Sequence, residues 1–528
     1  MRLRIYPVSL KQGLILSASG GLAQALTLPR SSWWPLAFFC LIPLYAAAKE
    51  QVPKRAFLFG WIYGLTLGLL SFSWLAEVMA GYGGLGSGGW VILFLLAAFL
   101  ALFQAVWARL ICSFQPGKFG PYSIPIIGAG LWVGLDFGKN WVFTGFNWSP
   151  LAVGLSSVPS LMGAADLIGL YGLGLPVAAV SGWLFYLDLK NIKTYPLLLI
   201  SILTVGALYA YGHKTYTQWE ERISQGPEKK IAVLQASIDQ MIKWDRDHRD
   251  LILARLETLM NRAQRENPWL TVWSETAAPF SYGYDAYETE WLDTVIKKSR
   301  TGALVGVTAV EDVNGQHHLF NRAWLMTSGG SGPFYDKRHL VPFGEYVPMA
   351  EELPFLKWPF FQGVLGAAGT YSQGPSRPPI IYDNVRLGIM ICFESIFPYL
   401  ARDRTLEGAQ LLVVTTNDAW FGLSWAPEQH LHQSLWRAAE NRRPLVRAAN
   451  NGVSGYINPS GRLMAHSAQN EIETYIYPIS LLPPQYLELT VFTRFGHYLP
   501  AGLAIVTALL ALVRLLKWYI KIVPKNCE

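Results

Sequence analysis

Charged residues are scarce in this sequence. Asp, Glu, Lys and Arg make up only 15% of the 528 residues, whereas 52% are hydrophobic. Soluble domains carry about a quarter charged residues, so the composition argues against an ordinary cytosolic enzyme. Aromatic residues reach 14%, and this abundance, together with the low charge, excludes a disordered chain. At about 100–200 residues per domain, the length accommodates two to four domains.

The middle of the chain lacks the long apolar runs that fill both ends. A bilayer core of about 30 Å requires about 20 apolar residues per spanning helix. By this measure the sequence predicts an α-helical membrane domain with eight spans, seven before the middle block and one after it. We therefore predict a transmembrane domain at 1–212, a globular domain at 213–490, and a C-terminal span with its tail at 491–528. The predicted spans are 12–29, 33–48, 56–79, 89–113, 122–138, 160–187, 195–212 and 498–519.

The net charge of +7 belongs to the membrane segments. Residues 1–212 hold 12 basic and 5 acidic side chains, residues 491–528 hold 5 and 1, and the middle block has a net charge of −4. This distribution gives no support to nucleic-acid binding. Lys and Arg gather in alternate loops, so the positive-inside rule predicts cytoplasmic termini and a middle block outside. A signal peptide cleaved near 23–25 is the competing interpretation of the N-terminus, and cleavage would leave the middle block outside.

Short β-rich runs alternate with polar helices in the middle block. Five apolar runs, each bounded by polar or turn residues, predict buried strands. Apolar residues at helical spacing predict helices over 250–265 and 428–443. Strands that alternate with helices indicate an α/β domain with a largely buried sheet. The predicted strands are 231–235, 270–274, 303–307, 387–391 and 411–415.

Cys392 has no other cysteine beside it in the middle block. A cysteine outside the membrane is usually half of a disulfide, yet this domain offers no partner. Cys392 follows a predicted buried strand, and strand ends are where α/β folds place reactive groups. A thiol needs a base or a nearby cation to become a thiolate, and Glu275 and Lys337 each stand at the end of another segment. A buried unreactive thiol and two solvated surface charges are the alternative interpretation.

These three residues stand in a specific sequence context. Glu275 follows an apolar strand, Lys337 lies in Tyr-Asp-Lys before a Pro-Phe-Gly-Glu turn, and Cys392 begins Cys-Phe-Glu. In this order the segments resemble the nitrilase superfamily of carbon–nitrogen hydrolases, an αββα sandwich with a Glu-Lys-Cys triad. The resemblance covers about 230–465. Two further segments agree with it, 416–422 and 447–452.

The predicted membrane spans narrow the resemblance from the whole superfamily to one family within it. A nitrilase-like domain between seven N-terminal helices and one C-terminal helix is similar to the apolipoprotein N-acyltransferase family of the bacterial inner membrane. Phe146 and Trp148, in Thr-Gly-Phe-Asn-Trp, resemble that family's membrane-face loop, and so does Trp244, in Lys-Trp-Asp. The resemblance places the catalytic domain in the periplasm. For the aromatic loops, an interfacial aromatic belt is the alternative to a substrate entrance.

The family resemblance implies a ping-pong acyl transfer that needs no metal or organic cofactor. Glu275 takes the proton of Cys392, whose thiolate attacks the sn-1 ester of a phospholipid, typically phosphatidylethanolamine. Lys337 and the backbone N–H of Phe393 stabilise the oxyanion. The resulting thioester is then attacked by the α-amino group of diacylglyceryl-cysteine at the N-terminus of an apolipoprotein.

The same resemblance implies roles for further residues. Glu345 is placed to orient Lys337, and Glu394 and Trp244 match positions used around the thiol and the acceptor. Phe393 departs from the Tyr of some relatives, which removes a hydroxyl contact and leaves the backbone donor. We expect a monomer that binds phospholipid, lipoproteins and membrane lipid, and no nucleic acid.

Two other classes of function stay open at the level of sequence. A membrane-tethered amidase or nitrilase would hydrolyse a C–N bond of a small substrate. A transporter would use Asp136 and Asp166, because charges within spans usually mark function, although their position near helix ends favours solvation or a structural hydrogen bond. A transporter or scaffold would keep its function after loss of Cys392. His430 and His432 have the wrong spacing for metal ligands on one helix face, and we expect surface or capping roles for both.

Overall fold

A computed structural model describes residues 7–81, 84–114, 116–313, 315–348, 352 and 371–522. The chain divides into two compact units. The helical unit comprises Met1–Ser73, Trp90–Tyr211 and Phe495–Glu528. The sandwich unit comprises Trp74–Gly89 and Gly212–Arg494, so it includes a short N-terminal segment besides the middle block.

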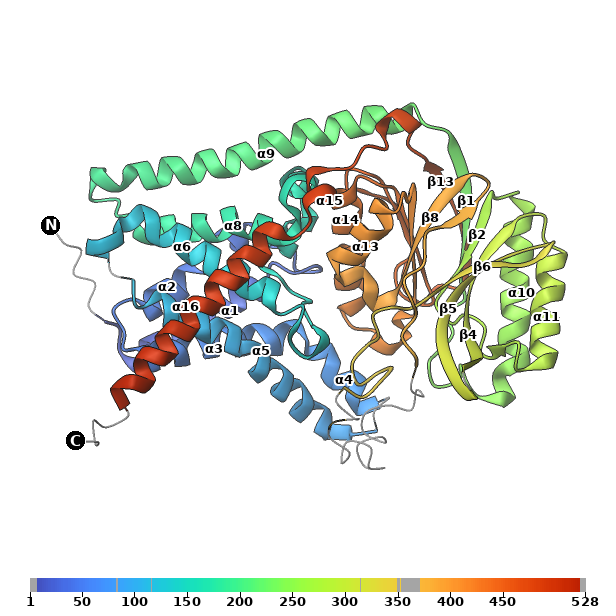
Figure 1. Ribbon diagram of the computed structural model, residues 1–528, viewed down its shortest axis with the longest axis horizontal. Helices are drawn as coiled ribbons and strands as arrows, with labels where there is room; N and C mark the ends of the chain where they lie inside the picture. Colours follow the sequence, from blue (N-terminus) through green and yellow to red (C-terminus); the bar gives the residue numbers. More distant parts are fainter. Residues whose placement is uncertain are drawn as a thin grey trace. The chain divides into compact units, whose positions relative to one another are not determined.

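Apolar helices build the helical unit, and local signals mark where several begin (Figure 1). The Ser9 hydroxyl accepts from the backbone N–H of Gln12, whose side chain accepts from the backbone N–H of Ser9; this capping box starts the first helix. Pro53 occupies the first turn of α3, where its missing N–H costs nothing. The main helices are α1 (Leu10–Ala25), α2 (Ile42–Ala48), α3 (Pro53–Ser71), α5 (Gly89–Ile111), α6 (Pro116–Gly138), α8 (Ala165–Tyr186), α9 (Tyr195–Ser224) and α16 (Tyr498–Ile522).

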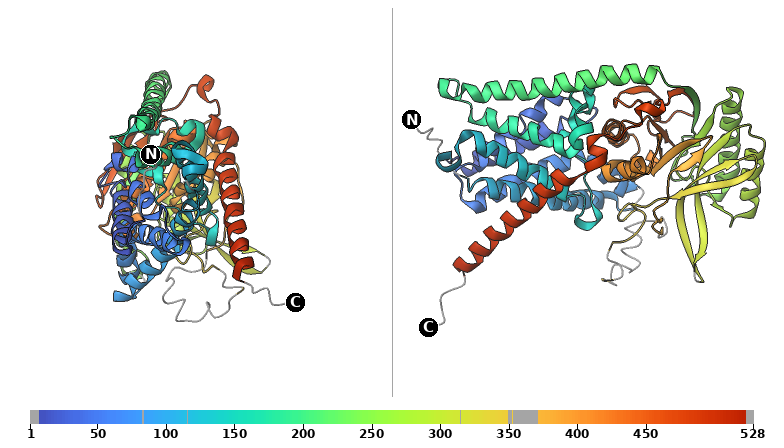
Figure 2. Two further views of the ribbon diagram at one scale, coloured as in Figure 1. Left: turned by 90° about the vertical axis from the view of Figure 1, so that its left-hand side faces the viewer. Right: turned by 45° about the horizontal axis from the view of Figure 1, so that its top comes forward.

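Small residues allow these helices to approach one another closely. A Cβ at Gly64 of α3 would lie 2.5 Å from the Cα of Ala101 on α5, and a Cβ at Gly134 of α6 would lie 2.6 Å from the backbone oxygen of Leu503 on α16. Helix α16 packs against α6 (Figure 2). Close contact through small residues is how helices associate in lipid, where apolar side chains gain nothing by leaving the hydrocarbon.

The expected count of eight membrane spans is not confirmed. Among the described residues, three helices are long and apolar enough to cross a membrane: Gly86–Ile111, Ala165–Tyr186 and Ile192–Ser224. Pro53–Ser71 and Ser73–Gly81, the latter being α4, make a fourth if this pair, bent by 54°, counts as one span. Two shorter apolar helical stretches lie among the described residues, Trp34–Ala48 and Tyr498–Val513, and the second is the first part of α16.

Two β-sheets form the centre of the sandwich unit. Among the described residues, one sheet has seven strands in the order β13-β1-β2-β4-β5-β6 with β3 beside β4, and the other has six in the order β12-β11-β10-β9-β8-β7. The strands of the first sheet are β1 (Glu228–Gln235), β2 (Leu270–Trp273), β3 (Ser281–Tyr282), β4 (Gly302–Val313), β5 (Gln316–Thr327), β6 (Gly330–Asp336) and β13 (Glu473–Ser480). Those of the second are β7 (Ile380–Tyr382), β8 (Val385–Ile391), β9 (Leu411–Thr416), β10 (Leu445–Ala449), β11 (Gly455–Ile457) and β12 (Leu463–His466).

Helices cover the outer faces of both sheets and complete an αββα sandwich (Figure 1). One hydrophobic core lies between the sheets and includes Val272 and Ile389. A second core joins the first sheet to two helices, α10 (Arg249–Arg265) and α11 (Ala286–Lys297). On the other side, α13 (Pro398–Leu406) and α14 (Ala426–Asn441) pack against the second sheet. The sandwich predicted from the nitrilase resemblance is therefore confirmed.

The five predicted strands appear as β1, β2, β4, β8 and β9, and the two predicted helices as α10 and α14. Strand β2 runs parallel to β1 and β4, and β9 runs parallel to β8 and β10. Residues that follow β2, β8 and β9 therefore leave the sheets at strand ends, where α/β folds assemble their sites.

Candidate active site

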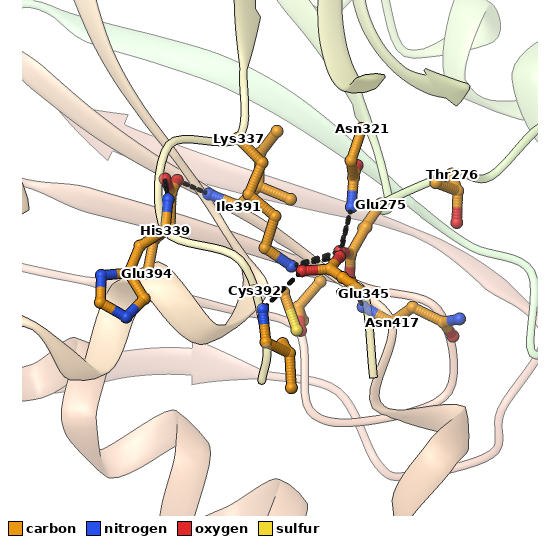
Figure 3. Close-up of polar contacts among 12 residues, drawn as sticks. Glu275, Thr276, Asn321, Lys337, His339, Glu345, Ile391, Cys392, Glu394 and Asn417 are labelled. Carbon is orange, nitrogen blue, oxygen red and sulfur yellow. Dashed lines mark hydrogen bonds and ion pairs between the residues drawn. The ribbon is translucent and has the colours of Figure 1, made fainter. Parts of the chain in front are cut away.

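The three residues of the predicted triad meet in the sandwich unit. Glu275 follows β2, Lys337 follows β6 and Cys392 follows β8. The Nζ of Lys337 lies 3.1 Å from Oε1 of Glu275 and 2.8 Å from Oε1 of Glu345. Figure 3 shows Cys392 beside this group of charges. Because Glu275, Lys337 and Cys392 are at most 9% exposed, the charges interact in a poorly hydrated space, where they are strong.

Glu275 is held as a carboxylate from both sides. Besides Lys337, its Oε1 accepts from Nδ2 of Asn321 at 2.7 Å, and its Oε2 accepts from the backbone N–H of Asn417 at 2.8 Å. Burial alone would raise the pKa of Glu275, but the Lys337 charge and the Asn321 hydrogen bond outweigh it and lower the pKa below its ordinary value. The group is therefore ionised and ready to accept a proton.

Lys337 is held as a cation between two carboxylates. Burial lowers the pKa of a lysine, yet Glu275 and Glu345 together raise the pKa of Lys337 well above its ordinary value. Glu345 is fixed in turn, because its Oε2 accepts from the backbone N–H of Val341 at 2.8 Å and its Oε1 accepts from Asn321 at 3.1 Å. Glu345 therefore contacts Lys337 directly, and the orienting role that the family resemblance implies for it stays a prediction.

Cys392 sits in a conformation that few residues adopt. Its φ is +54°, a left-handed value that costs free energy unless neighbouring groups hold the backbone. Burial and the nearby Glu275 raise the pKa of the thiol above its ordinary value, so the sulfur stays protonated until a base takes its proton. The next residue, Phe393, is buried against the rings of Phe397 and His339.

Glu394 joins the cysteine loop to the lysine loop. Its carboxylate is fully buried and accepts from the backbone N–H groups of Ile391, Arg338 and His339 at 2.7, 2.7 and 3.1 Å. The Tyr335 hydroxyl donates to it as well, at 2.9 Å. Burial raises the pKa of Glu394, and these backbone donors oppose the rise. Glu394 therefore fixes the spacing of Cys392 and Lys337 through the backbone that carries them (Figure 3).

A buried polar network lies behind Cys392. The Nε2 of His430 is 3.1 Å from the backbone oxygen of Cys392 and 3.0 Å from the Ser395 hydroxyl, and its Nδ1 is 3.0 Å from Asp418. Arg447 donates to Asp418 at 2.8 Å. His430 is fully buried, so the expected surface or capping role was wrong for it: helix α14 packs this face onto the cysteine loop. His432 is partly buried.

Substitution of Asp418 by Asn is expected to destabilise the sandwich unit. The change leaves the buried Arg447 cation without its counter-charge, which costs about 3–5 kcal/mol and lowers Tm by about 10 °C. Arg447 and His430 outweigh burial and hold the pKa of Asp418 below its ordinary value, so its contribution is complete at neutral pH and is lost at acid pH. The stability difference between wild type and variant should therefore shrink as the pH falls below about 4.

Thermal unfolding of the detergent-solubilised protein between pH 3 and 8 measures this effect. The exposed Asp250, near the start of α10, provides a matched Asp→Asn control with little expected change. Equal Tm values for D418N and D250N at pH 7 would contradict the importance of the network.

The three predicted substrate-binding residues lie in different units. Trp244, 46% exposed, belongs to the sandwich unit, in the turn between β1 and α10. Phe146 and Trp148 belong to the helical unit, where their rings stack with centroids 6.0 Å apart and Trp148 is buried. Their role in substrate binding stays a prediction.

The Asp136 carboxylate is held by hydrogen bonds within the helical unit. It accepts from Lys139 Nζ at 2.7 Å, from the Trp132 indole at 3.1 Å and from the backbone N–H of Leu151 at 3.1 Å. Asp166, the second residue that a transporter would use, accepts from the Tyr211 hydroxyl at 3.1 Å. These contacts agree with structural hydrogen bonding rather than with a transport path.

Sequence reasoning missed several polar residues of the site. Asn321 lies in the middle of β5, and Lys243 lies one residue before Trp244. Asn417 and Asp418 stand in the segment 416–422, which agreed with the nitrilase resemblance but carried no assigned role. In the described part of the chain, no group of three or more His, Cys, Asp or Glu residues is arranged to hold a metal ion.

Comparison with known proteins agrees with both units. Residues 20–183 match the family model for the apolipoprotein N-acyltransferase N-terminal domain, and residues 230–482 match that for carbon-nitrogen hydrolase. The chain is 35% identical to an apolipoprotein N-acyltransferase of Geobacter metallireducens over 86% of both proteins. It is 31% identical to one of Azotobacter vinelandii over 95% of both. A solved carbon-nitrogen hydrolase of Helicobacter pylori G27 is 17% identical, with a TM-score of 0.37 over 51% of this chain and 94% of that one.

Proposed function

Because the chain belongs to the apolipoprotein N-acyltransferase family, we propose that it transfers an acyl chain from a phospholipid to the N-terminal amine of an apolipoprotein. The observation that carries the proposal is the arrangement of Cys392 beside Glu275 and Lys337 at the ends of β8, β2 and β6. The acyl chain passes through a thioester on Cys392, which makes the reaction a double displacement.

In the first half-reaction Glu275 accepts the proton of the Cys392 thiol. The thiolate attacks the sn-1 ester carbonyl of a phospholipid such as phosphatidylethanolamine, and negative charge develops on the carbonyl oxygen. The Lys337 ammonium and the backbone N–H of Phe393 stabilise this oxyanion. When the ester C–O bond breaks, Glu275 returns the proton to the departing lysophospholipid oxygen, and the acyl group stays on sulfur.

In the second half-reaction the attacking group is an amine instead of the Cys392 thiolate. The α-amino group of a diacylglyceryl-cysteine attacks the thioester carbonyl while Glu275 accepts its proton. The C–S bond then breaks, the proton returns to sulfur, and the product is an amide. Glu275, Lys337 and Cys392 perform both halves of the reaction, and neither half calls for a metal or an organic cofactor.

The nature of the substrates explains why the protein needs the helical unit. Donor and acceptor are both held in a bilayer by acyl chains that each gain about 0.8 kcal/mol per buried CH₂, so the enzyme works at the membrane surface. We place the protein in the bacterial inner membrane as a monomer, with both termini cytoplasmic and the sandwich unit periplasmic. The distribution of Lys and Arg supports this orientation.

The proposal is tested by incubating the purified protein with phosphatidylethanolamine vesicles alone and examining the Cys392 peptide by mass spectrometry. The expected result is an added acyl mass that hydroxylamine removes, together with an equal amount of lysophospholipid. Addition of a diacylglyceryl-cysteine peptide should then discharge the thioester and yield the N-acylated peptide. Release of free fatty acid with no acylated peptide would instead support the hydrolase that the sequence left open.

A further inference from the structure

Lys243 is a second buried amine in the sandwich unit, and the mechanism above does not use it. The side chain is 1% exposed. Its Nζ donates to the Thr276 hydroxyl at 2.8 Å and lies 3.4 Å from the backbone oxygen of Glu275. Among the described residues, it forms no ion pair with a carboxylate. A lysine buried this completely is usually paired with an opposite charge, so its position calls for an explanation.

The groups that Lys243 contacts carry the catalytic base. Glu275 and Thr276 form the turn at which the chain leaves β2, and Thr276 has a φ of +42°, a left-handed value that a β-branched residue rarely adopts. The surrounding structure must hold such a backbone in place. Lys243 reaches this turn from the segment after β1 and contacts both of its residues, so it holds the backbone from which the Glu275 side chain extends.

The charge of Lys243 acts against stability rather than for it. Burial lowers the pKa of Lys243 to about 8, although Glu275 and Cys392 partly oppose the shift. Because the unfolded chain binds the proton more tightly, the charged amine lowers the free energy of unfolding at neutral pH, and stability rises with pH between about 8 and 10. A purely structural role would be filled as well by an apolar side chain of similar length.

We propose that Lys243 is a positioning residue for the catalytic base: its ammonium holds the Glu275–Thr276 turn and supplies a second positive charge when the Cys392 thiolate forms. This inference rests on the proposed function and deepens it. In the resting site, the Lys337 charge is shared between Glu275 and Glu345. Proton transfer from Cys392 to Glu275 leaves the thiolate as a new negative charge, and Lys243 is the further cation that interacts with it.

The test compares Lys243→Met with Lys230→Met, the same change at an exposed lysine of β1. Full-length proteins react with an excess of phosphatidylethanolamine vesicles, and the rate of Cys392 acylation is followed by mass spectrometry. K243M is expected to acylate about 10²-fold more slowly, the order that misplacement of a reacting group costs. For K243M, the phospholipid concentration that gives half the maximal rate should not be lower than that of wild type. The Tm of K243M at pH 7 should not be lower than that of wild type either. K230M should match wild type in all three measurements.

A third variant, Lys243→Arg, keeps the positive charge but changes the shape of the side chain. The pH dependence of its acylation rate therefore shows which of the two properties matters. The titratable groups that act on Lys243 are Glu275 and Cys392. In wild type the acylation rate should fall above about pH 8, when Lys243 loses its proton. Arginine keeps its charge at every accessible pH, so K243R should retain part of the rate and lose this alkaline decline.

The possible results distinguish failure of the proposed function from failure of the role of Lys243. Absence of acylation in wild type would refute the proposed function. Acylation of wild type and K243M at equal rates would overturn the role of Lys243 alone. A slower K243M with a Tm lowered in parallel, and an alkaline decline unchanged in K243R, would also overturn it, because those results describe a structural lysine.

Discussion

Replacement of Cys392 by alanine is expected to abolish both acylation of the protein by phospholipid and transfer to the lipoprotein amine. No other group among the triad residues can form the thioester, and loss of a covalent nucleophile costs about 10⁴- to 10⁶-fold in rate. Serine at the same position is expected to be almost as inactive, because a carboxylate with the low pKa of Glu275 is too weak a base for a hydroxyl group. The measurement is transfer of labelled acyl chains from phosphatidylethanolamine to a diacylglyceryl-cysteine peptide.

Cys112 offers the matched control for this change. It lies partly buried in the helical unit, and Cys112→Ala should leave transfer close to the wild-type rate. Thermal unfolding of both variants shows whether the folded state survives, which we expect because alanine fits the space of the thiol. Transfer by C392A above about 1% of the wild-type rate would mean that another nucleophile carries the acyl chain.

Replacement of Lys337 by methionine is expected to lower the rate of Cys392 acylation by about 10³-fold or more. An oxyanion donor alone is worth about 10²–10³, and this change also removes the cation between Glu275 and Glu345. The buried Glu275 and the partly buried Glu345 would then share Asn321 with no positive charge between them. Like charges in such proximity raise the pKa of one partner, so a proton would occupy the site that must accept one from the thiol.

The pH dependence distinguishes these two consequences of losing Lys337. In wild type, Lys337 lowers the pKa of Glu275, so the base remains ionised well into the acid range. In K337M the acid limb of the acylation rate should move toward neutral pH, and part of the rate should return as the pH rises through neutrality. Lys298→Met, at an exposed position after α11, is the matched control. An unshifted acid limb in K337M would show that Lys337 does not control the ionisation of Glu275.

Much of the sandwich unit could be predicted from local sequence. The run 387–391 is apolar throughout because β8 is buried on both faces, and continuous apolar runs of this length are typical of central parallel strands. Once the strands were recognised, Cys392 and Glu275 had to lie at strand ends. Their order relative to Lys337 was sufficient to indicate the superfamily, and the distance between Lys337 and Glu275 agrees with it.

The helical unit was harder to predict, because hydropathy reports composition and not continuity. The stretch 33–48 is apolar but contains a turn of 3-10 helix followed by the short α2. Residues 56–79 satisfy the length criterion, yet the structure divides them into α3 and α4 with a bend of 54°. A window average cannot detect such breaks, which depend on how neighbouring helices pack.

The sequence by itself determined the α/β class of the middle block, because periodicity and strand ends are local properties. The division into membrane and catalytic parts was predicted from hydropathy and charge distribution, and the Glu-Lys-Cys triad is what the family resemblance implies; both stay predictions. Only the tertiary structure decided which polar groups serve the triad: the backbone N–H of Asn417 lies 142 residues from Glu275 and still donates to it, and His430 reaches the backbone oxygen of Cys392 from a separate helix. The physical reason is that a buried polar atom must find a partner, and that partner is chosen by contact in space, which no local pattern records.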